Sequence, residues 1–199
     1  MTIEFTTAYT KTPVVEFSWP ADELQPLFND YQTWENESDF KGGSYTGMSK
    51  RLSKKAEQVR GTPAWDDLEY AMSSSKNQLV EKMLEIDNEF RWPNMPIQIS
   101  NQLYVYARLV SDLAGHDMNP HIDNRSVYAA GYLNVFDNKP VTVVSTKRLP
   151  IFNLSRYRAP GKKGHGAIWL NTNNSWHWVN KASKDRRIVL FTFHLVPWN

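Results

Sequence analysis

The stretch that decides the fold begins at residue 97 and contains IQISNQLYVYARLV (97–110), RSVYAAGYLNVF (125–136), KPVTVVST (139–146), GAIWLNT (166–172), SWHWV (175–179) and RRIVLFTFHLV (186–196). Each run is short and rich in β-branched or aromatic residues, and turn-like segments separate one run from the next. None of the runs has a helical period of useful length. Many short strands at this spacing predict an antiparallel β-sandwich or barrel over residues 97–199.

The N-terminal part of the chain reads instead as mixed helix and loop. TPVVEFSW (12–19) has the β-branched and aromatic content of a strand. Thr62-Pro63 predicts the start of a helix, because threonine is a good N-cap and proline fits the first helical position. A second helix is expected from the capping-box-like segment Ser75-Lys-Asn-Gln78 to a point before Trp92-Pro93, and its apolar stripe is expected to be core: Leu79, Val80, Met83, Leu84 and Phe90.

A polar stretch from Trp34 to Gly61 contains Gly42-Gly43, several serines and a basic patch. We expect a solvated surface loop here, with a mobile lid over a pocket as the alternative. A chain of 199 residues, 41% of them hydrophobic, is long enough for one sizeable core. The expected organisation is therefore a single domain over 1–199 of the mainly β, α+β class, with helices and lid in 1–96 and the β core in 97–199.

Composition excludes several kinds of function. The chain has no cysteine, so disulfide scaffolds, thiolate metal sites and cysteine nucleophiles are ruled out. A formal net charge of +2 is near balance, and nothing in it indicates nucleic acid or a membrane surface as a partner. The N-terminus does not resemble a signal peptide, and no apolar run approaches the 18 or so residues of a spanning helix. We therefore expect a cytoplasmic protein of unknown oligomeric state.

His121-Ile122-Asp123 is the most informative group for chemistry. In an extended chain, residues two apart point to the same side, so the imidazole and the carboxylate can converge on one metal ion. His177, in a β-like run with bulky neighbours, is the candidate for a third ligand. Two histidines and one carboxylate leave three positions of a metal open, an arrangement typical of non-haem iron(II) oxygenases. The other three histidines are expected to pack or to lie in turns: His116, His165 and His194.

Arg187 lies ten residues after His177 and begins an otherwise apolar strand. A planar guanidinium in such a place is suited to an anionic partner, above all a carboxylate. Arg186 is the neighbouring alternative, nine residues after His177, but the apolar pattern that follows favours Arg187.

HIDN (121–124), YLN (132–134), WHWV (176–179) and R-x-x-L (187–190) follow one another in an order that resembles the iron(II)- and 2-oxoglutarate-dependent dioxygenases. The likeness is greatest to their prolyl-hydroxylase-like branch, which has phage and marine bacterial members. It covers about half of the chain, from Gln102 to Leu195. The resemblance implies a distorted double-stranded β-helix, the jelly roll that cupins share, and this agrees with the strands expected from the sequence.

The resemblance also implies roles for individual residues. His121, Asp123 and His177 match the three iron ligands, and Arg187 matches the basic residue that pairs with the distal carboxylate of 2-oxoglutarate. Tyr132 falls where related enzymes have a tyrosine that hydrogen-bonds the same carboxylate. A further hydroxyl is expected from Tyr104 or Tyr106, which share one face of their strand with Arg108.

The implied activity is hydroxylation of an unactivated C–H bond, with consumption of 2-oxoglutarate and O2, release of succinate and CO2, and ascorbate as a supporting reductant. A small molecule or a peptide is the expected substrate, and a prolyl residue, another amino-acid residue or a free amino acid is favoured. The alternatives are a non-redox, cupin-like protein that binds zinc with the same three ligands, and a catalytically silent binding protein. A halogenase is disfavoured, because those relatives lack the carboxylate that Asp123 provides.

A basic segment within residues 138–165 has no counterpart in this scheme. It is expected to be a solvated loop, with contact to an acidic substrate as the alternative: Lys147, Arg148, Arg156, Arg158, Lys162 and Lys163.

Overall fold

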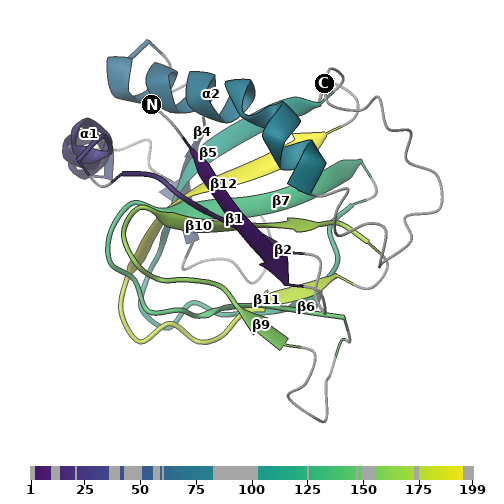
Figure 1. Ribbon diagram of the computed structural model, residues 1–199. Helices are drawn as coiled ribbons and strands as arrows, with labels where there is room; N and C mark the ends of the chain where they lie inside the picture. The colour runs from purple at the N-terminus through teal and green to yellow at the C-terminus, as the bar shows by residue number, and fades with distance from the viewer. Residues whose placement is uncertain are drawn as a thin grey trace.

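Two antiparallel sheets make up the β part of the protein in the computed structural model (Figure 1). The structure describes residues 3–9, 14–20, 22–35, 41–42, 51–55, 59, 61–82, 103–124, 126–146, 148, 156–172 and 175–194. The larger sheet has eight strands, in the order β1 (Glu4–Tyr9), β2 (Val14–Ser18), β10 (His165–Leu170), β7 (Val127–Asn134), β12 (Arg186–His194), β5 (Tyr104–Asp112), β4 (Arg51–Lys55) and β3 (Lys41–Gly42). The smaller sheet has four, in the order β6 (Met118–His121), β11 (Trp176–Val179), β8 (Thr142–Ser145) and β9 (Arg156–Arg158).

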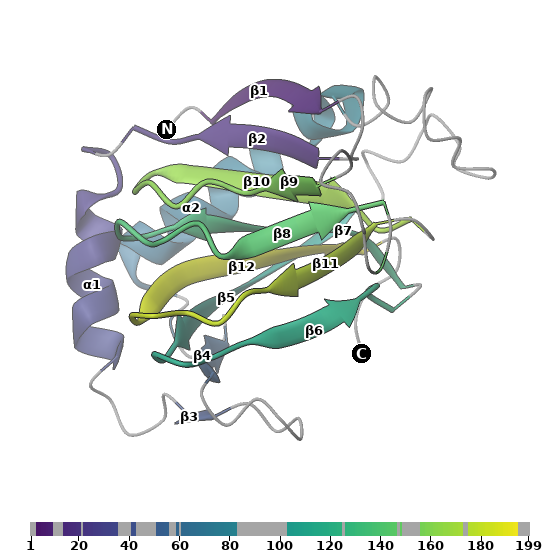
Figure 2. The ribbon, with the colours of Figure 1, turned by 90° about the horizontal axis from the view of Figure 1, so that it is seen from below.

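The two sheets are stacked, and Figure 2 looks onto the smaller one with the larger behind it. Val110 and Ile188 of the larger sheet belong to the same buried hydrophobic cluster as Val144 and Tyr157 of the smaller sheet. The expected sandwich of short strands, with the jelly-roll arrangement of two facing sheets, is therefore confirmed.

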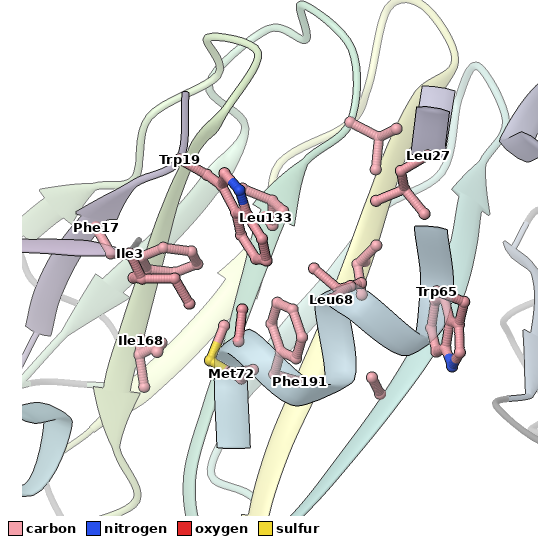
Figure 3. Packing of buried hydrophobic residues seen from close by; sticks show 14 of the residues in the cluster. Ile3, Phe17, Trp19, Leu27, Trp65, Leu68, Met72, Leu133, Ile168 and Phe191 are labelled. Carbon is pink, nitrogen blue, oxygen red and sulfur yellow. The ribbon is translucent and has the colours of Figure 1, made fainter. Parts of the chain in front are cut away.

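Two helices cover the other face of the larger sheet: α1 (Gln25–Glu35) and α2 (Pro63–Ser74) (Figure 1). Leu68 and Met72 of α2 pack in one cluster with Phe191 of β12 (Figure 3). The indole of Trp65 is fully buried and stands edge-on to Trp34 of α1, with ring centroids 6.4 Å apart. Burial of each such large side chain contributes roughly 1.5–3 kcal/mol to folding, so the helices fix the sheet from behind.

Cover on both faces explains the apolar character of the central strands. All eight residues of β7 are buried, because helices cover one side and the smaller sheet covers the other. In β12 the side chains alternate between the two cores: Val189 and Phe191 pack on the helix side, whereas Ile188 and Leu190 pack on the side of the smaller sheet. The two-residue period of β12 therefore decides which of its polar residues face the space between the sheets.

The expected strand over residues 12–19 is confirmed as β2, and the helix that begins at Thr62-Pro63 is confirmed as α2. Thr62 has the extended backbone of an N-cap, but its hydroxyl donates to the Val59 carbonyl (2.8 Å) and does not cap the helix. Residues 76–82 are helical, with Leu79 and Val80 buried as expected. The other expected stripe residues and the Trp92-Pro93 terminus lie outside the described residues.

The stretch from Trp34 to Gly61 is not wholly a loop. Residues 51–55 form β4, which pairs with β5 over Arg51 to Lys55, and residues 41–42 pair with β4 as β3. The interpretation of this stretch as a solvated loop or lid is therefore wrong for these residues. They extend the larger sheet at its β5 edge, because an unpaired edge of β5 would leave backbone groups without partners. No helix within the described residues is both long and apolar enough to cross a membrane.

Gly131 in β7 provides a test of the close packing in the larger sheet. A Cβ atom at this position would lie 2.4 Å from the Ala167 carbonyl oxygen and 2.8 Å from Cα of Ile168, both of which are backbone atoms of β10. We expect Gly131→Ala to lower the free energy of unfolding by about 1–3 kcal/mol, because the backbone must shift to make room. Urea denaturation measures the change. A variant as stable as the parent would contradict the close approach of β7 and β10.

Candidate active site

Three side chains converge on the inner face of the smaller sheet. His121 at the end of β6 is directly paired with His177 of β11, and their imidazole centroids lie 4.1 Å apart. Asp123 follows two residues later and lies between them. Its Oδ1 is 3.9 Å from Nε2 of His121, and its Oδ2 is 3.5 Å from Nε2 of His177. One ligand atom from each residue lies within 4.8 Å of the other two, so the structure brings together the three residues that the sequence singled out.

Backbone carbonyls orient both imidazoles. Nδ1 of His121 donates to the Asn119 carbonyl (2.9 Å), and Nδ1 of His177 donates to the Ser175 carbonyl (3.3 Å). Because the Nδ1 atoms carry the protons, the Nε2 atoms keep their lone pairs and point them at the common centre. The loop after Asp123 is held from β10, since the Asn171 amide nitrogen lies 3.2 Å from the Asp123 carbonyl oxygen and 2.9 Å from that of Val127.

Asp123 has the electrostatic character of a metal ligand. Burial acts to raise the pKa of its carboxyl, but the electrostatic interactions with His177, His121 and His194 outweigh burial and hold the pKa below its usual range. Oδ2 is buried without a hydrogen bond of good geometry from the described residues. Two imidazole nitrogens and an ionised carboxylate, whose buried Oδ2 can still accept a bond, fit a divalent iron ion with open positions.

The cluster lines a cavity of about 470 Å³ between the two sheets. Trp169 closes one side of the site, with its ring centroid 4.9 Å from that of His177. Most of the remaining wall is apolar, and it includes Val110, Val179, Ile188 and Leu190. Such a wall excludes water around a small polar centre, as ligand sites commonly require.

Arg186 also lines this cavity, in phase with Ile188 and Leu190 on the inner face of β12. Its Nε and Nη2 donate to Oδ2 of Asp112, at 3.0 and 2.7 Å, and its Nη1 donates to the hydroxyl of Thr142. The guanidinium carbon lies 5.3 Å from the ring centroid of Tyr132. A guanidinium has five N–H groups. Within the described structure these contacts use three of them, so that two remain for a ligand.

Arg187 lies on the other face of β12 and does not line the cavity. Its Nε donates to Oε2 of Glu35 on α1 (2.7 Å), and its guanidinium lies over the ring of Phe136 (5.3 Å). The expectation that Arg187 faces the pocket is therefore corrected: one step along a strand reverses the direction of the side chain, and the cavity side belongs to Arg186.

Of the three expected tyrosines, only Tyr132 lines the cavity. Its hydroxyl donates to the Pro160 carbonyl (2.9 Å), and burial raises its pKa to about 12, so the phenol stays protonated. Tyr104 is 45% exposed, and Tyr106 stands edge-on to His194. Tyr106 pairs with Thr192 and Tyr104 pairs with His194, at the end of β12 that is far from Arg186. His194 lies eight residues from Arg186, which is roughly 26 Å along the strand, so both tyrosines depart from expectation.

Four residues of the site were not selected from the sequence: Asp112, Thr142, Trp169 and Asn171. None belongs to a recognisable motif, and Asp112, Thr142 and Asn171 act through partners that are distant along the chain. Arg108 and His194, which also line the cavity, extend it beyond the metal cluster. Arg156 and Arg158 of the basic segment are exposed, as expected, but they belong to strand β9 and not to a loop.

No family model matches the chain, and no curated protein matches it in sequence. Solved structures do match it. A prolyl-4-hydroxylase from Pseudomonas putida is 12% identical with a TM-score of 0.64, covering 92% of this chain and 93% of that one. A Trichoplax adhaerens prolyl hydroxylase in complex with a hypoxia inducible factor peptide is 13% identical with a TM-score of 0.57, covering 96% and 83%.

The epimerase SnoN of nogalamycin biosynthesis, in complex with Fe3+, alpha ketoglutarate and nogalamycin RO, is 8% identical with a TM-score of 0.62, covering 94% of this chain and 80% of that one. At these identities the likeness is one of fold. The chain therefore has the double-stranded β-helix fold of the iron(II)- and 2-oxoglutarate-dependent oxygenases, including prolyl hydroxylases.

Proposed function

We propose that the protein is an iron(II)- and 2-oxoglutarate-dependent dioxygenase that hydroxylates an unactivated C–H bond and releases succinate and CO2. One observation carries the proposal: a single cavity holds both the His121–Asp123–His177 cluster and a buried arginine with two N–H groups left for a ligand. A metal that keeps open positions and a cation for a carboxylate are the two features that a 2-oxo diacid needs.

The spacing of the two features supports a short diacid. Thr142, which contacts Arg186, pairs with Val179, and Val179 lies two residues along β11 from His177. Two residues of a strand correspond to roughly 7 Å. Arg186 therefore reaches the cavity wall close to the His121–Asp123–His177 cluster, as a short diacid that spans the two features requires.

In this proposal His121, Asp123 and His177 hold the iron, and Arg186 binds the distal carboxylate through its remaining N–H groups. Tyr132 supports the guanidinium with its ring, and Thr142 fixes one edge of it. Bound iron(II) would supply the redox chemistry with O2. The chain's own share is ligand geometry, fixed imidazole tautomers and an apolar wall that keeps water from the reacting centre.

A small molecule or a peptide is the proposed substrate class, and a prolyl or other amino-acid residue or a free amino acid is favoured. The support comes from the similar structures, which include a prolyl hydroxylase with a bound peptide and an epimerase with a bound small molecule. The cavity continues past the cluster to Arg108 and His194, and this part is proposed to receive the substrate.

The first prediction concerns turnover. Purified protein is expected to bind one iron(II) per chain and to convert 2-oxoglutarate into succinate under air with ascorbate, slowly when no substrate is added. Screening pooled amino acids, peptides and oligonucleotides for faster succinate formation would then identify the substrate class. Binding of zinc without any calorimetric signal for 2-oxoglutarate would favour a non-redox, cupin-like protein instead.

His177→Ala is expected to abolish iron binding and turnover while the fold survives. The imidazole lies at the cavity wall, and the core on the helix side does not involve it. Metal content by mass spectrometry and thermal melting by circular dichroism measure the two effects separately. Activity at the wild-type level in this variant would rule out the metal cluster.

Arg186→Met is expected to weaken 2-oxoglutarate binding by about 10²-fold or more, because hydrogen bonds to charged groups contribute roughly 1.5–3 kcal/mol each and about 1.4 kcal/mol corresponds to tenfold. Iron binding should persist. Arg186→Lys, which keeps the charge beside Asp112 but loses the planar fork, should show an intermediate loss. Anaerobic titration of the iron-loaded protein, followed by the metal-to-ligand charge-transfer band, measures the affinity.

Arg187→Met is the matched control for this experiment. It removes an adjacent arginine of the same strand, but one that pairs with Glu35 on the helix side, so cosubstrate affinity should not change. If Arg187→Met lost affinity while Arg186→Met kept it, the assignment of the carboxylate to Arg186 would be incorrect.

A further inference from the structure

We infer that Asp112 and His116 are positioning residues: together they orient the guanidinium of Arg186 so that its terminal nitrogens face the cosubstrate. This inference rests on the proposed function and deepens it, since it concerns how the carboxylate subsite is built. Asp112 is 0% exposed and Arg186 is 4% exposed, and they face one another as a directly paired position of β5 and β12.

The contact between Asp112 and Arg186 is selective for one edge of the guanidinium. Nε and Nη2 both donate to Oδ2 of Asp112, so the side edge of the planar group is taken. Thr142 takes one N–H of Nη1. One N–H on each terminal nitrogen is left, so the two terminal nitrogens can still donate two hydrogen bonds to a carboxylate. If Asp112 accepted from the terminal fork, that edge would be lost to the ligand.

His116 supports Asp112 from behind. Its Nε2 lies 3.5 Å from Oδ1 of Asp112, the oxygen that Arg186 does not use, and the imidazole is only 2% exposed. The turn that carries His116 is fixed: Gly115, at φ 83°, donates its N–H to the Ala182 carbonyl (2.7 Å), and the His116 carbonyl accepts from the Ala182 N–H (2.9 Å). The β5–β6 turn is thereby joined to the turn before β12, and both ends of the network are held together.

A structural ion pair alone is a weak explanation for this network. Desolvation of a buried carboxylate and guanidinium offsets most of their attraction, so such pairs contribute little net stability compared with apolar residues of similar size. The neighbouring Arg187–Glu35 pair shows the ordinary case, with the arginine side chain 34% exposed and outside the cavity. Only the inner pair is fully desolvated and borders the cavity, where orientation of a fork has a consequence.

The test compares two ligands that differ only at the distal end. 2-Oxopentanoate has the 2-oxo acid of 2-oxoglutarate but a methyl group where the distal carboxylate would be, so it cannot engage Arg186. Each is titrated into anaerobic iron-loaded protein. Asp112→Asn should weaken 2-oxoglutarate binding about tenfold or more and leave 2-oxopentanoate binding unchanged, because only the carboxylate subsite is disturbed. His116→Gln should reduce the preference for 2-oxoglutarate in the same direction by a smaller factor.

Glu35→Gln is the matched control: it breaks the arginine–carboxylate pair on the outer face of the same strands and should leave both affinities unchanged. If Asp112→Asn does not fold, His116→Gln decides, since it keeps the Arg186–Asp112 pair. If the variants bound both ligands equally more weakly, Asp112 and His116 would have a purely structural role. If the variants kept full affinity for 2-oxoglutarate, these residues would have no role in its binding. Either result overturns the inference. Wild-type protein that binds iron but not 2-oxoglutarate would instead overturn the proposed function, and this inference with it.

Discussion

Side chains alternate along β12 between two buried cores, and this alternation determines how both sheets and the cavity are arranged. Val189, Phe191 and Phe193 are buried on the side of the helices, and this fixes the rotation of the strand. Because the period is two, the residues in between must face the smaller sheet. A slip of one residue would turn Arg187 and the phenylalanines toward the smaller sheet and Arg186 toward the helix-side core, at a cost of several kilocalories per mole. The apolar core thus decides which arginine can meet a ligand.

The same constraint separates structural from chemical residues. Helices and β12 hold the larger sheet, which supplies Arg186 and Tyr132, while the smaller sheet supplies the two histidines through the direct pairing of β6 with β11. Close approach of β10 to Gly131 keeps the strands of the larger sheet tight. The cavity is therefore bounded by two packed sheets, and its polar groups are held in place before any ligand binds, as a preorganised site requires.

Much of this was available from the sequence, and the failures have physical reasons. The HxD pair could be selected because its two ligands lie close together in the chain, and His177 because it stands in a β-like run with bulky neighbours. The short strands could be predicted because they are rich in β-branched and aromatic residues. Helix α1 was missed although Leu27, Phe28, Tyr31 and Trp34 recur at helical spacing. The arginine that faces the cavity was predicted incorrectly from the apolar run, although the alternation of β12 contained the information: Arg186, Thr192 and His194 lie on the same face of the strand. Asp112 and Thr142 could not be found, since only tertiary pairing brings them to Arg186.

The two ends of the cavity differ in how their side chains are held, and this bears on the proposed substrate choice. Around the His121–Asp123–His177 cluster and Arg186, a neighbouring backbone carbonyl orients the His177 imidazole, and Asp112 of the adjacent strand holds the guanidinium. Around Arg108, Thr192 and His194, the cavity wall consists of side chains that the two apolar cores do not determine. Similar structures that share the fold bind ligands as different as a peptide and nogalamycin RO. That range is expected because one fold can present different side chains around the same central cavity.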